Sequence, residues 1–504
     1  MPLLHQQLIT SHQYTSDASL KLAVPSSAHF QYPEKVLQFG TGVLLRGLPD
    51  YFIDQANKKG HFKGRILVVK STSGDTQSFD QQDGLYTLVV RGLEEGIATE
   101  KYIVNSAISR VLSAQQAWKE IIASASNEVL QVVISNTTEV GIQYVEEDIF
   151  QTPPTSYPAK LTAWLYARYQ HFKNDSPHTV IIPTELIPNN AGQLQSFVKK
   201  HSTRHQLGED FGKWLDEIVT FCGSLVDRIV TGLPETQEAE EMYKKLGFED
   251  KLLAVTEPYK LWAIEGSDKV KEILTFALEQ PDIIITPDIT YYRERKLRIL
   301  NGSHTISVPL GFISGLDTVL DCMKDEQMSR FFTEVIHQEI VPTIPQADLT
   351  DLSAFADDIL NRYRNPYLVH KLINITLQST SKMRMRNVPT LLRYVAKEGK
   401  IPEKMALGFA AYLFFMRVTH QEGDQFYGML RDQAYPINDD QAAYFHSLWQ
   451  KINPPSPNTL EKYVREVSSN QTLWETDLTQ LPQFVSTVTK HLEALLKKSL
   501  KSTV

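Results

Sequence analysis

The sequence predicts an α/β protein of two domains. A domain built on a mostly parallel sheet (residues 30–290) is followed by an all-α domain (residues 291–504). Three observations support this. A chain of 504 residues exceeds the usual reach of one hydrophobic core. In the first half, short β-branched segments alternate with helical periodicity, which is typical of parallel sheets covered by helices. Beyond residue 296 the strand signals stop.

The expected strands of the first domain are short apolar segments bounded by Gly, Pro or polar turns. They are Val36–Phe39, Arg65–Val69, Tyr86–Val90, Leu130–Ile134, Thr179–Ile182 and Asp282–Thr286. Helical periodicity appears between them at Leu161–Phe172 and Gly192–His201. Alternation of this kind favours a mostly parallel sheet with helices on its faces.

The second domain contains a series of helical patterns separated by Pro- and Asn-rich breaks. They are Ser329–Ile340, Ser353–Arg364, Tyr367–Gln378, Ala406–Arg417, Gln441–Lys451 and Phe484–Leu500. The last has an apolar stripe that should dock onto the rest of the domain. The division near residue 290 predicts an active site in the interdomain cleft, because clefts form where domains meet.

Composition narrows the class of protein. The formal charge of −8 and the pI of about 6.0 argue against nucleic acid or an acidic membrane as partner. Cys222 and Cys322 have no metal-ligand spacing, and we expect both in the core and no metal. The N-terminus lacks the pattern of a signal peptide, so we expect a cytoplasmic enzyme. The oligomeric state stays open.

A Gly-x-Gly turn follows the first expected strand. Small residues there allow the backbone to approach a pyrophosphate, whose charge the following helix favours. The third glycine of the usual fingerprint is replaced by Leu45. We expect a Rossmann-like cofactor turn formed by Phe39, Gly40, Gly42, Leu45 and Arg46.

The segment that holds Lys296, Asn301 and His304 combines an amine, an amide and an imidazole. If it is α-helical, ~100° per residue keeps the three within roughly 140° of one another. A lysine with a lowered pKa can move a proton on and off an alcohol oxygen. An amide can stabilise the alkoxide and a histidine can hold the substrate oxygen. The alternative is a helix start with scattered polar residues.

These motifs resemble the polyol-specific long-chain dehydrogenases typified by mannitol dehydrogenase. Lys296, Asn301 and His304 match the family's Lys-x4-Asn-x2-His motif, and Asn190 matches a second asparagine of its oxyanion site. The turn from Phe39 to Arg46 matches the family's Phe-Gly-x-Gly-x-x-x-Arg. The resemblance implies direct hydride transfer with NAD, Lys296 as general acid and base, and no metal.

Five further sequence segments resemble the corresponding segments of family members that interconvert tagaturonate and altronate. They are Gln82–Thr87, Ser135–Glu139, Ser156–Thr162, Leu225–Gly232 and Arg362–Pro366. The resemblance therefore implies a small sugar-acid substrate. Fructuronate reductase and a mannitol-type polyol dehydrogenase are the alternatives among enzymes, and a dinucleotide-sensing binding protein is the alternative outside them. Some relatives have a glutamate at the position of Arg293; here the acid is Glu294, and we assign it no proton relay.

Polar residues after the fourth expected strand are candidates for cofactor contact. Ser135, Asn136, Thr137 and Glu139 would lie beyond the carboxyl end of a parallel strand, where ligands bind. Helix capping is the alternative. The second strand ends at Lys70 without the acid that usually accepts the ribose hydroxyls of NAD, and a lysine could attract the 2′-phosphate of NADP. The resemblance favours NAD.

A basic run at Lys382, Arg384 and Arg386 suits the carboxylate of a sugar acid. The alternative is a solvated basic surface. In the family, residues that match Lys382 and Arg362 lie at the substrate cleft, and we expect these two, together with His370, to bind the substrate.

Overall fold

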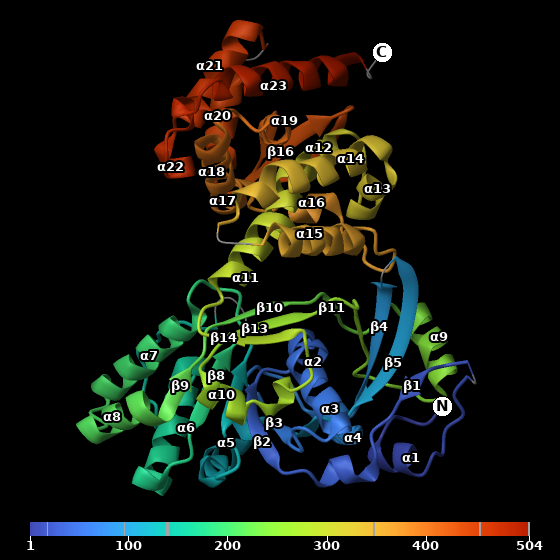
Figure 1. Ribbon diagram of the computed structural model, residues 1–504, viewed down its shortest axis with the longest axis vertical. Coiled ribbons are helices and arrows are strands. Elements are labelled where there is room, and N and C mark those ends of the chain that lie inside the picture. The colour runs from blue at the N-terminus through green and yellow to red at the C-terminus, as the bar shows by residue number, and fades with distance from the viewer. Residues whose placement is uncertain (18, 95, 138–140, 346–347, 453–454, 502–504) are drawn as a thin grey trace. The chain divides into compact units, whose positions relative to one another are not determined.

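The structure is a computed structural model of the 504-residue chain. It describes all residues except 18, 95, 138–140, 346–347, 453–454 and 502–504. The chain forms two compact units, Met1–Ile289 and Thr290–Val504. In Figure 1, unit 1 has the blue to green colours and unit 2 the yellow-green to red ones.

The central sheet of unit 1 has six strands, all paired in parallel, in the order β6-β3-β2-β7-β8-β9. The strands are β2 (Glu34–Phe39), β3 (Arg65–Lys70), β6 (Ile108–Ser113), β7 (Val132–Ser135), β8 (Thr179–Pro183) and β9 (Val219–Phe221). Strand β2 is the first strand of this sheet in chain order. Strands β3 and β6 follow on one side of it, and β7, β8 and β9 on the other. The strand order therefore reverses between β2 and β7. Ligands of such sheets bind beyond the carboxyl ends of the strands at this reversal.

Both faces of this sheet are buried, because alternate residues of its strands enter two different cores. In β2, Val36 belongs to one core, with Phe52 of α3 (Pro49–Lys59), whereas Leu37 belongs to the other, with Trp164 of α6 (Tyr157–Phe172). Burial of each such side chain stabilises the fold by about 1.5–3 kcal/mol. This explains why the strands have continuous apolar runs, as buried parallel strands do.

Two smaller sheets complete unit 1. The five-stranded sheet β1-β5-β4-β12-β11 is mixed, and the three-stranded sheet has the order β10-β13-β14. Their strands are β1 (Leu22–Ala23), β4 (Tyr86–Glu94), β5 (Ile97–Asn105), β10 (Ser224–Asp227), β11 (Val230–Thr231), β12 (Ala254–Thr256), β13 (Leu261–Glu265) and β14 (Ile283–Thr286). The expected strands at 86–90 and 282–286 therefore form, but outside the central sheet. The first thirty residues also belong to unit 1, where β1 pairs with β5.

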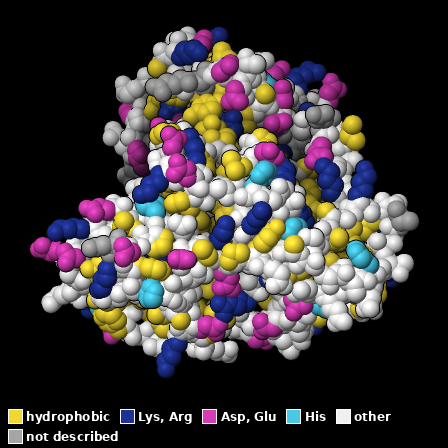
Figure 2. Space-filling view, turned by 60° about the horizontal axis from the view of Figure 1, so that its bottom comes forward, with side chains coloured by type: hydrophobic (Ala, Val, Ile, Leu, Met, Phe, Trp, Pro, Cys, Tyr) yellow, Lys and Arg dark blue, Asp and Glu magenta, His cyan; other side chains and the backbone are white. Residues whose placement is uncertain are grey.

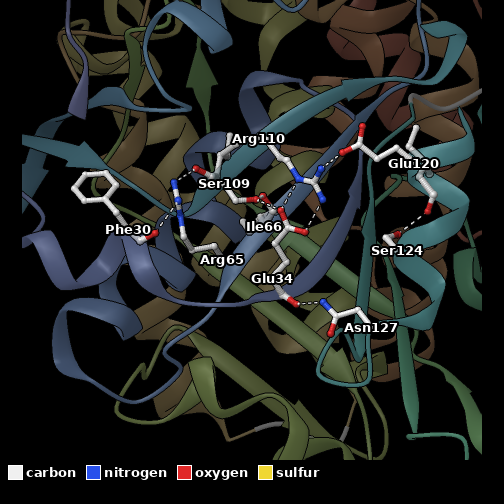
Figure 3. A network of polar contacts seen from close by, with 11 residues as sticks. Phe30, Glu34, Arg65, Ile66, Ser109, Arg110, Glu120, Ser124 and Asn127 are labelled. Atoms are coloured by element: carbon white, nitrogen blue, oxygen red, sulfur yellow. Dashed lines mark hydrogen bonds and ion pairs between the residues drawn. The ribbon is translucent and has the colours of Figure 1, made fainter. Parts of the chain in front are cut away.

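A polar network ties together the starts of three central strands (Figure 3). Arg110 of β6 binds Glu34 of β2 through two hydrogen bonds, of 2.8 Å to Oε1 and 3.0 Å to Oε2. The Ser109 hydroxyl donates to Oε1 of the same carboxylate at 2.7 Å. Burial would raise the pKa of Glu34, but the hydrogen bonds from Arg110 and Ser109 hold it below its ordinary value. Arg65 of β3 donates to the carbonyls of Ile108 at 2.5 Å and Phe30 at 3.4 Å. This network fixes the edge of the sheet opposite to the carboxyl ends of its strands.

Unit 2 is helical, as predicted. Its longer helices include α12 (Ser303–Ile313), α15 (Leu349–Tyr363), α18 (Val388–Glu398), α19 (Glu403–Phe415), α21 (Pro457–Ser468) and α23 (Phe484–Lys501). Helix α19 packs between α12 and α23 and is buried along nearly its whole length, which explains its continuous apolar sequence. Within the described residues, no helix has the length and apolarity that crossing a bilayer requires.

Two parts of unit 2 differ from the helical expectation. The helix expected at Tyr367–Gln378 is reduced to α16 (Leu372–Ile375), and Lys371 just before it pairs with Thr318 in a β-bridge instead. The second difference is a set of strands. A three-stranded antiparallel sheet is formed by β15 (His420–Glu422), β16 (Gln425–Leu430) and β17 (Gln433–Ile437). These strands contain few β-branched residues and are largely half-buried or exposed, so their sequence lacks the usual strand signal. Tyr435 anchors the sheet, because its ring stacks on Phe415 with centroids 5.0 Å apart.

The surface of the molecule is mixed in charge on the face in Figure 2. There, dark blue cationic and magenta acidic side chains are interspersed among uncharged ones, and no broad area of either sign is drawn. Such a surface has no extended basic stripe on this face.

Candidate functional site

The predicted catalytic motif begins on a π-helical turn. Helix α11 (Thr290–Arg295) continues into the π-helix η5 (Lys296–Gly302) and then into α12. The expectation of a continuous α-helix is wrong here, and the spacing of ~100° per residue does not apply. In a π-helix the backbone bonds join residues five apart, which is the separation of Lys296 and Asn301. Short π turns within α-helices are frequent at functional sites.

Side chains hold this turn in place by binding its displaced carbonyls. The Tyr363 hydroxyl donates to the Leu300 carbonyl at 2.9 Å and is 2.8 Å from the Ser303 hydroxyl. The Asn387 amide donates to the Gly302 carbonyl at 2.9 Å. A buried carbonyl without a partner is costly, so these bonds stabilise the π geometry. Tyr363 and Asn387 were not predicted, because their role depends on contacts distant in sequence.

His304 lies in the first turn of α12, against Tyr363. The two rings stack with centroids 4.2 Å apart and planes inclined by 24°. Burial holds the pKa of His304 well below its ordinary value, and the positive charges of His370, Arg362, Arg386 and Lys382 lower it further. Its Nε2 atom is buried and has no hydrogen-bond partner among the described residues. The imidazole is therefore neutral, and this nitrogen can bind a substrate oxygen.

Basic side chains around His304 form what we term the basic cluster: Arg362, His370, Lys382 and Arg386. Of these, His370 itself has a pKa lowered by burial and by the charge of Arg362, so the permanent charges are those of the arginines and the lysine. The rings of His304 and His370 are 6.4 Å apart, and Arg386 reaches the Thr305 hydroxyl of α12 at 3.1 Å. Burial and the charge of Arg386 lower the pKa of Lys382, and the negative charge of Asp439 offsets part of this lowering. The predicted substrate residues are thus brought close to His304.

The basic run on α17 (Ser379–Arg386) divides between two surroundings. Arg386 joins the basic cluster, whereas Arg384 faces Glu475 at 3.6 Å. A site with one buried and two half-buried cations around a neutral histidine favours an anionic ligand, since binding a carboxylate would neutralise their repulsion. The alternative of a uniformly solvated basic run does not hold for Lys382 or Arg386.

The Gly-x-Gly turn of unit 1 has the shape that a dinucleotide requires. Gly40 has a φ of +123°, and a Cβ there would lie 2.8 Å from the Asn136 carbonyl and 2.9 Å from Leu45. At Gly42, which precedes α2 (Val43–Gly47), an added Cβ would meet nothing within 4 Å. Gly40 is therefore needed for the turn itself, and Gly42 leaves open space for a pyrophosphate. Phe39 and Leu45 are fully buried and support the turn from within.

The side chain of Arg46, the last residue of the expected cofactor turn, points into the core of unit 1. Its side chain is buried and donates to the Leu252 carbonyl, with its guanidinium 5.4 Å from the Tyr86 ring. The Tyr86 hydroxyl in turn donates to the Arg46 carbonyl at 2.7 Å. Arg46 thus anchors the turn to the core instead of facing open space.

The residues after β7 are organised by Glu185, which was not predicted. Its carboxylate accepts hydrogen bonds from the Ser135 hydroxyl at 3.1 Å and from the Thr137 amide and hydroxyl at 2.9 Å each. The Asn136 amide donates to the Thr184 carbonyl at 3.1 Å. Burial raises the pKa of Glu185 despite these bonds. The signal for Glu185 was an acid three residues after the expected strand Thr179–Ile182. Glu139 lies outside the described residues.

The Asn190 side chain is held by backbone groups of its own unit, and its predicted place in the oxyanion site stays a prediction. Its amide nitrogen is 3.1 Å from the carbonyls of Pro183, Glu185 and Ser224, and its oxygen accepts from the Ser224 amide at 3.3 Å. An amide group has two N–H donors, and three carbonyls already surround them. Asn190 therefore fastens the corner between β8 and α7 (Asn190–Arg204).

Two further features concern ligands. No group of three or more His, Cys, Asp or Glu side chains in the described part of the chain is arranged to hold a metal ion. At the end of β3, the Lys70 ammonium donates to the Thr72 hydroxyl at 3.0 Å. The carboxyl end of β3 therefore presents an amine and a hydroxyl, and no acid.

Comparisons with known proteins agree with this architecture. Residues 34–276 match the family model of the mannitol dehydrogenase Rossmann domain, and residues 288–496 match that of the mannitol dehydrogenase C-terminal domain. An altronate oxidoreductase of Bacillus subtilis (strain 168) is 38% identical over 470 residues, which are 92% of each chain. One of Klebsiella pneumoniae (strain 342) is 37% identical over 480 residues, which are 94% of this chain and 97% of that one.

Two solved structures share the fold over nearly the whole chain. Mannitol 2-dehydrogenase of Pseudomonas fluorescens, in a ternary complex with NAD and D-mannitol, has a TM-score of 0.69 at 20% identity and covers 99% of this chain and 98% of its own. A substrate-free D-sorbitol dehydrogenase has a TM-score of 0.80 at 17% identity, with 100% of both chains covered. The order of a sheet domain before a helical domain is thus common to all three.

Proposed function

Because the chain belongs to the mannitol dehydrogenase family and is a dehydrogenase that acts on CH–OH groups, we propose that it interconverts tagaturonate and altronate with NADH and NAD⁺. The observation that carries this proposal is the basic cluster around the neutral ring of His304. A neutral polyol gives such cations nothing to neutralise, whereas a sugar acid brings a carboxylate. The altronate oxidoreductases among the relatives support the same substrate.

The proposed chemistry needs one proton and one hydride. Bound NADH supplies the hydride to the keto carbon. Lys296 donates a proton to the keto oxygen as the alcohol forms, and it accepts this proton in the reverse direction. The Asn301 amide stabilises the negative charge that develops on the oxygen, and His304 orients the oxygen through Nε2. The resemblance to the family also assigns Asn190 to the oxyanion site, and in the structure its amide nitrogen lies 3.1 Å from three backbone carbonyls.

The cofactor proposal rests on the turn after β2. The positive φ of Gly40 and the open space at Gly42 fit a pyrophosphate at the strand reversal. We assign NAD as the cofactor on the resemblance to the family. The turn is supported from within by the buried side chains of Phe39, Leu45 and Arg46. Beside it lie Ser135, Asn136 and Thr137, which hydrogen bonds to Glu185 and Thr184 hold in place. We propose no metal in the reaction.

Which sugar acid is the substrate is decided by other observations than the basic cluster. Fructuronate has the same carboxylate, so the basic cluster fits it equally, and only the relatives favour tagaturonate. The test is a comparison of NADH oxidation by the purified protein with tagaturonate, fructuronate and the uncharged ketose fructose. We expect the highest kcat/KM with tagaturonate. A preference for fructose would overturn the sugar-acid proposal, and a preference for fructuronate would change only the acid.

A further inference from the structure

Arg298 connects the catalytic turn to the helix that carries the cations. It belongs to η5, as Lys296 does, and its side chain is buried. Its Nη1 atom donates to the carbonyls of Met385 at 2.6 Å and Arg386 at 3.0 Å. These carbonyls belong to the last turn of α17, the helix that carries Lys382 and Arg386 of the basic cluster. One side chain thus spans the two parts of the proposed site.

Glu294 orients this guanidinium from the preceding helix α11. Its Oε2 accepts from Nε of Arg298 at 3.2 Å, and its Oε1 accepts from Nη2 at 3.1 Å. Burial would raise the pKa of Glu294, but the hydrogen bonds and charges of Arg298 and Arg393 hold it below its ordinary value. The carboxylate is therefore ionised at neutral pH, and Arg298 has acceptors on both edges of its planar group.

We propose that Arg298, oriented by Glu294, is a positioning residue that sets the distance between Lys296 and the basic cluster. The inference rests on the proposed function, since a sugar acid must present its carbonyl to Lys296 while the cations hold its carboxylate. The two ends of such a substrate are joined by a carbon chain of fixed length. A displacement of ~1 Å can cost ~10²-fold in rate, so the span between the two groups matters.

The geometry requires a guanidinium. Arg298 directs Nε and Nη2 to the carboxylate and Nη1 to two carbonyls. A lysine has one compact ammonium group and cannot serve both sides with the same directions. The carbonyls at the end of α17 also favour a cation, because the C-terminus of a helix is electronegative.

The chain offers a matched control in Arg393 of α18. It also binds Glu294, through Nη1 at 2.6 Å, but among the described residues it makes no hydrogen bond or ion pair with α17. Arg393→Gln therefore removes a cation from the same carboxylate without removing the bonds to Met385 and Arg386. Arg298→Lys keeps the charge but breaks the bridge, and Glu294→Gln weakens the orientation of Arg298.

Two measurements test the proposal on the full-length protein. The first is amide hydrogen exchange over residues 379–386, which needs no substrate. Arg298→Lys should speed exchange in α17 by ~10-fold or more, whereas Arg393→Gln should leave it near the wild-type rate. The second is kcat/KM for the keto acid and for fructose. Arg298→Lys should lower the value for the acid by ~10-fold or more, with a smaller loss for fructose.

The outcomes separate this inference from the proposed function. Unchanged exchange in α17, or equal losses with both substrates, would overturn the positioning role. Wild-type protein that reduces no sugar acid would overturn the proposed function, while the exchange measurement would still decide whether Arg298 couples η5 to α17. If Arg298→Lys does not fold, Glu294→Gln should show the same changes to a smaller degree, and wild-type behaviour in that variant would contradict the proposal.

Discussion

The ring of His304 stacks on that of Tyr363 at a centroid distance of 4.2 Å, and the hydroxyl of Tyr363 binds the Leu300 carbonyl in the π turn at 2.9 Å. The ring of Tyr363 therefore supports His304 by stacking, and its hydroxyl supports the π turn by hydrogen bonding. Through these two contacts, a residue of α15 fixes how the motif presents its side chains.

Tyr363→Phe should separate these two roles. The variant keeps the stacked ring but leaves the Leu300 carbonyl without this donor, which should destabilise the protein by about 1–3 kcal/mol. We expect kcat to fall as well, because the π turn that carries Lys296 and Asn301 loses support. Urea unfolding and steady-state kinetics would measure both. Wild-type stability would show that Ser303 alone satisfies the Leu300 carbonyl.

The basic cluster should recognise the charge of the substrate. Lys382→Ala and Arg362→Ala should raise KM for tagaturonate, at a cost of about 1.5–3 kcal/mol for a charge-assisted hydrogen bond. Residual activity on fructose should change little. Arg384→Ala is a matched control on the same helix, because Arg384 faces Glu475 instead. Rates should be compared at fixed, moderate salt. Equal losses on both substrates would mean that Lys382 and Arg362 shape the site without binding the acid.

The two glycines of the cofactor turn should respond differently to a methyl group. Gly40→Ala places a Cβ 2.8 Å from the Asn136 carbonyl at a φ of +123°, so we expect lower stability together with weaker NADH binding. Gly42→Ala meets no protein atom within 4 Å, so the fold should persist and only NADH binding should weaken. Thermal unfolding and fluorescence titration with NADH would show this. Full NADH affinity in Gly42→Ala would place the pyrophosphate elsewhere.

Stability should depend on pH through Glu339 in unit 2. Burial raises the pKa of Glu339 from 4.5 to about 7, although its carboxylate accepts hydrogen bonds from the amides of Lys404 and Met405. Because the folded state binds this proton more tightly than the unfolded state, the contribution to stability is full below the unfolded pKa. It is lost as the pH rises through about 7.

Glu339→Gln tests this dependence, since the amide does not titrate. The fall in the free energy of unfolding between about pH 5 and pH 8 should be smaller in the variant, by on the order of 1–3 kcal/mol. The variant itself should be less stable at low pH, because one N–H at the start of α19 loses its acceptor. Parallel pH profiles for both proteins would contradict the raised pKa.

The sequence was informative wherever the relevant signal is local. Strand β2, the turn at Gly40 and the Lys296 motif are each formed by one continuous stretch of sequence. The structure has the strand and the turn where they were expected. The π turn was not predictable, because it depends on Tyr363 and Asn387, which are distant in sequence. Strands β15 to β17 contain few β-branched residues, so their composition gave only a weak strand signal.

The direction of side chains at the candidate site could not be predicted from the sequence. Asn190 and Arg46 lie in recognisable phrases, yet both point into the protein, where carbonyls from other segments bind them. A sequence motif gives the position of a residue along the chain, but contacts with distant segments decide which way its side chain points. For the same reason, Arg386 belongs to the basic cluster and Arg384 does not.

The most direct test of the account is the turnover of Lys296→Ala with tagaturonate and NADH, measured across the pH range. Removal of a general acid–base group should lower kcat by ~10²-fold or more. The affinity for NADH, measured by fluorescence, should stay near that of the wild type, because the cofactor turn lies in unit 1. Near-normal turnover of Lys296→Ala at every pH would contradict the assignment of Lys296 as the proton donor.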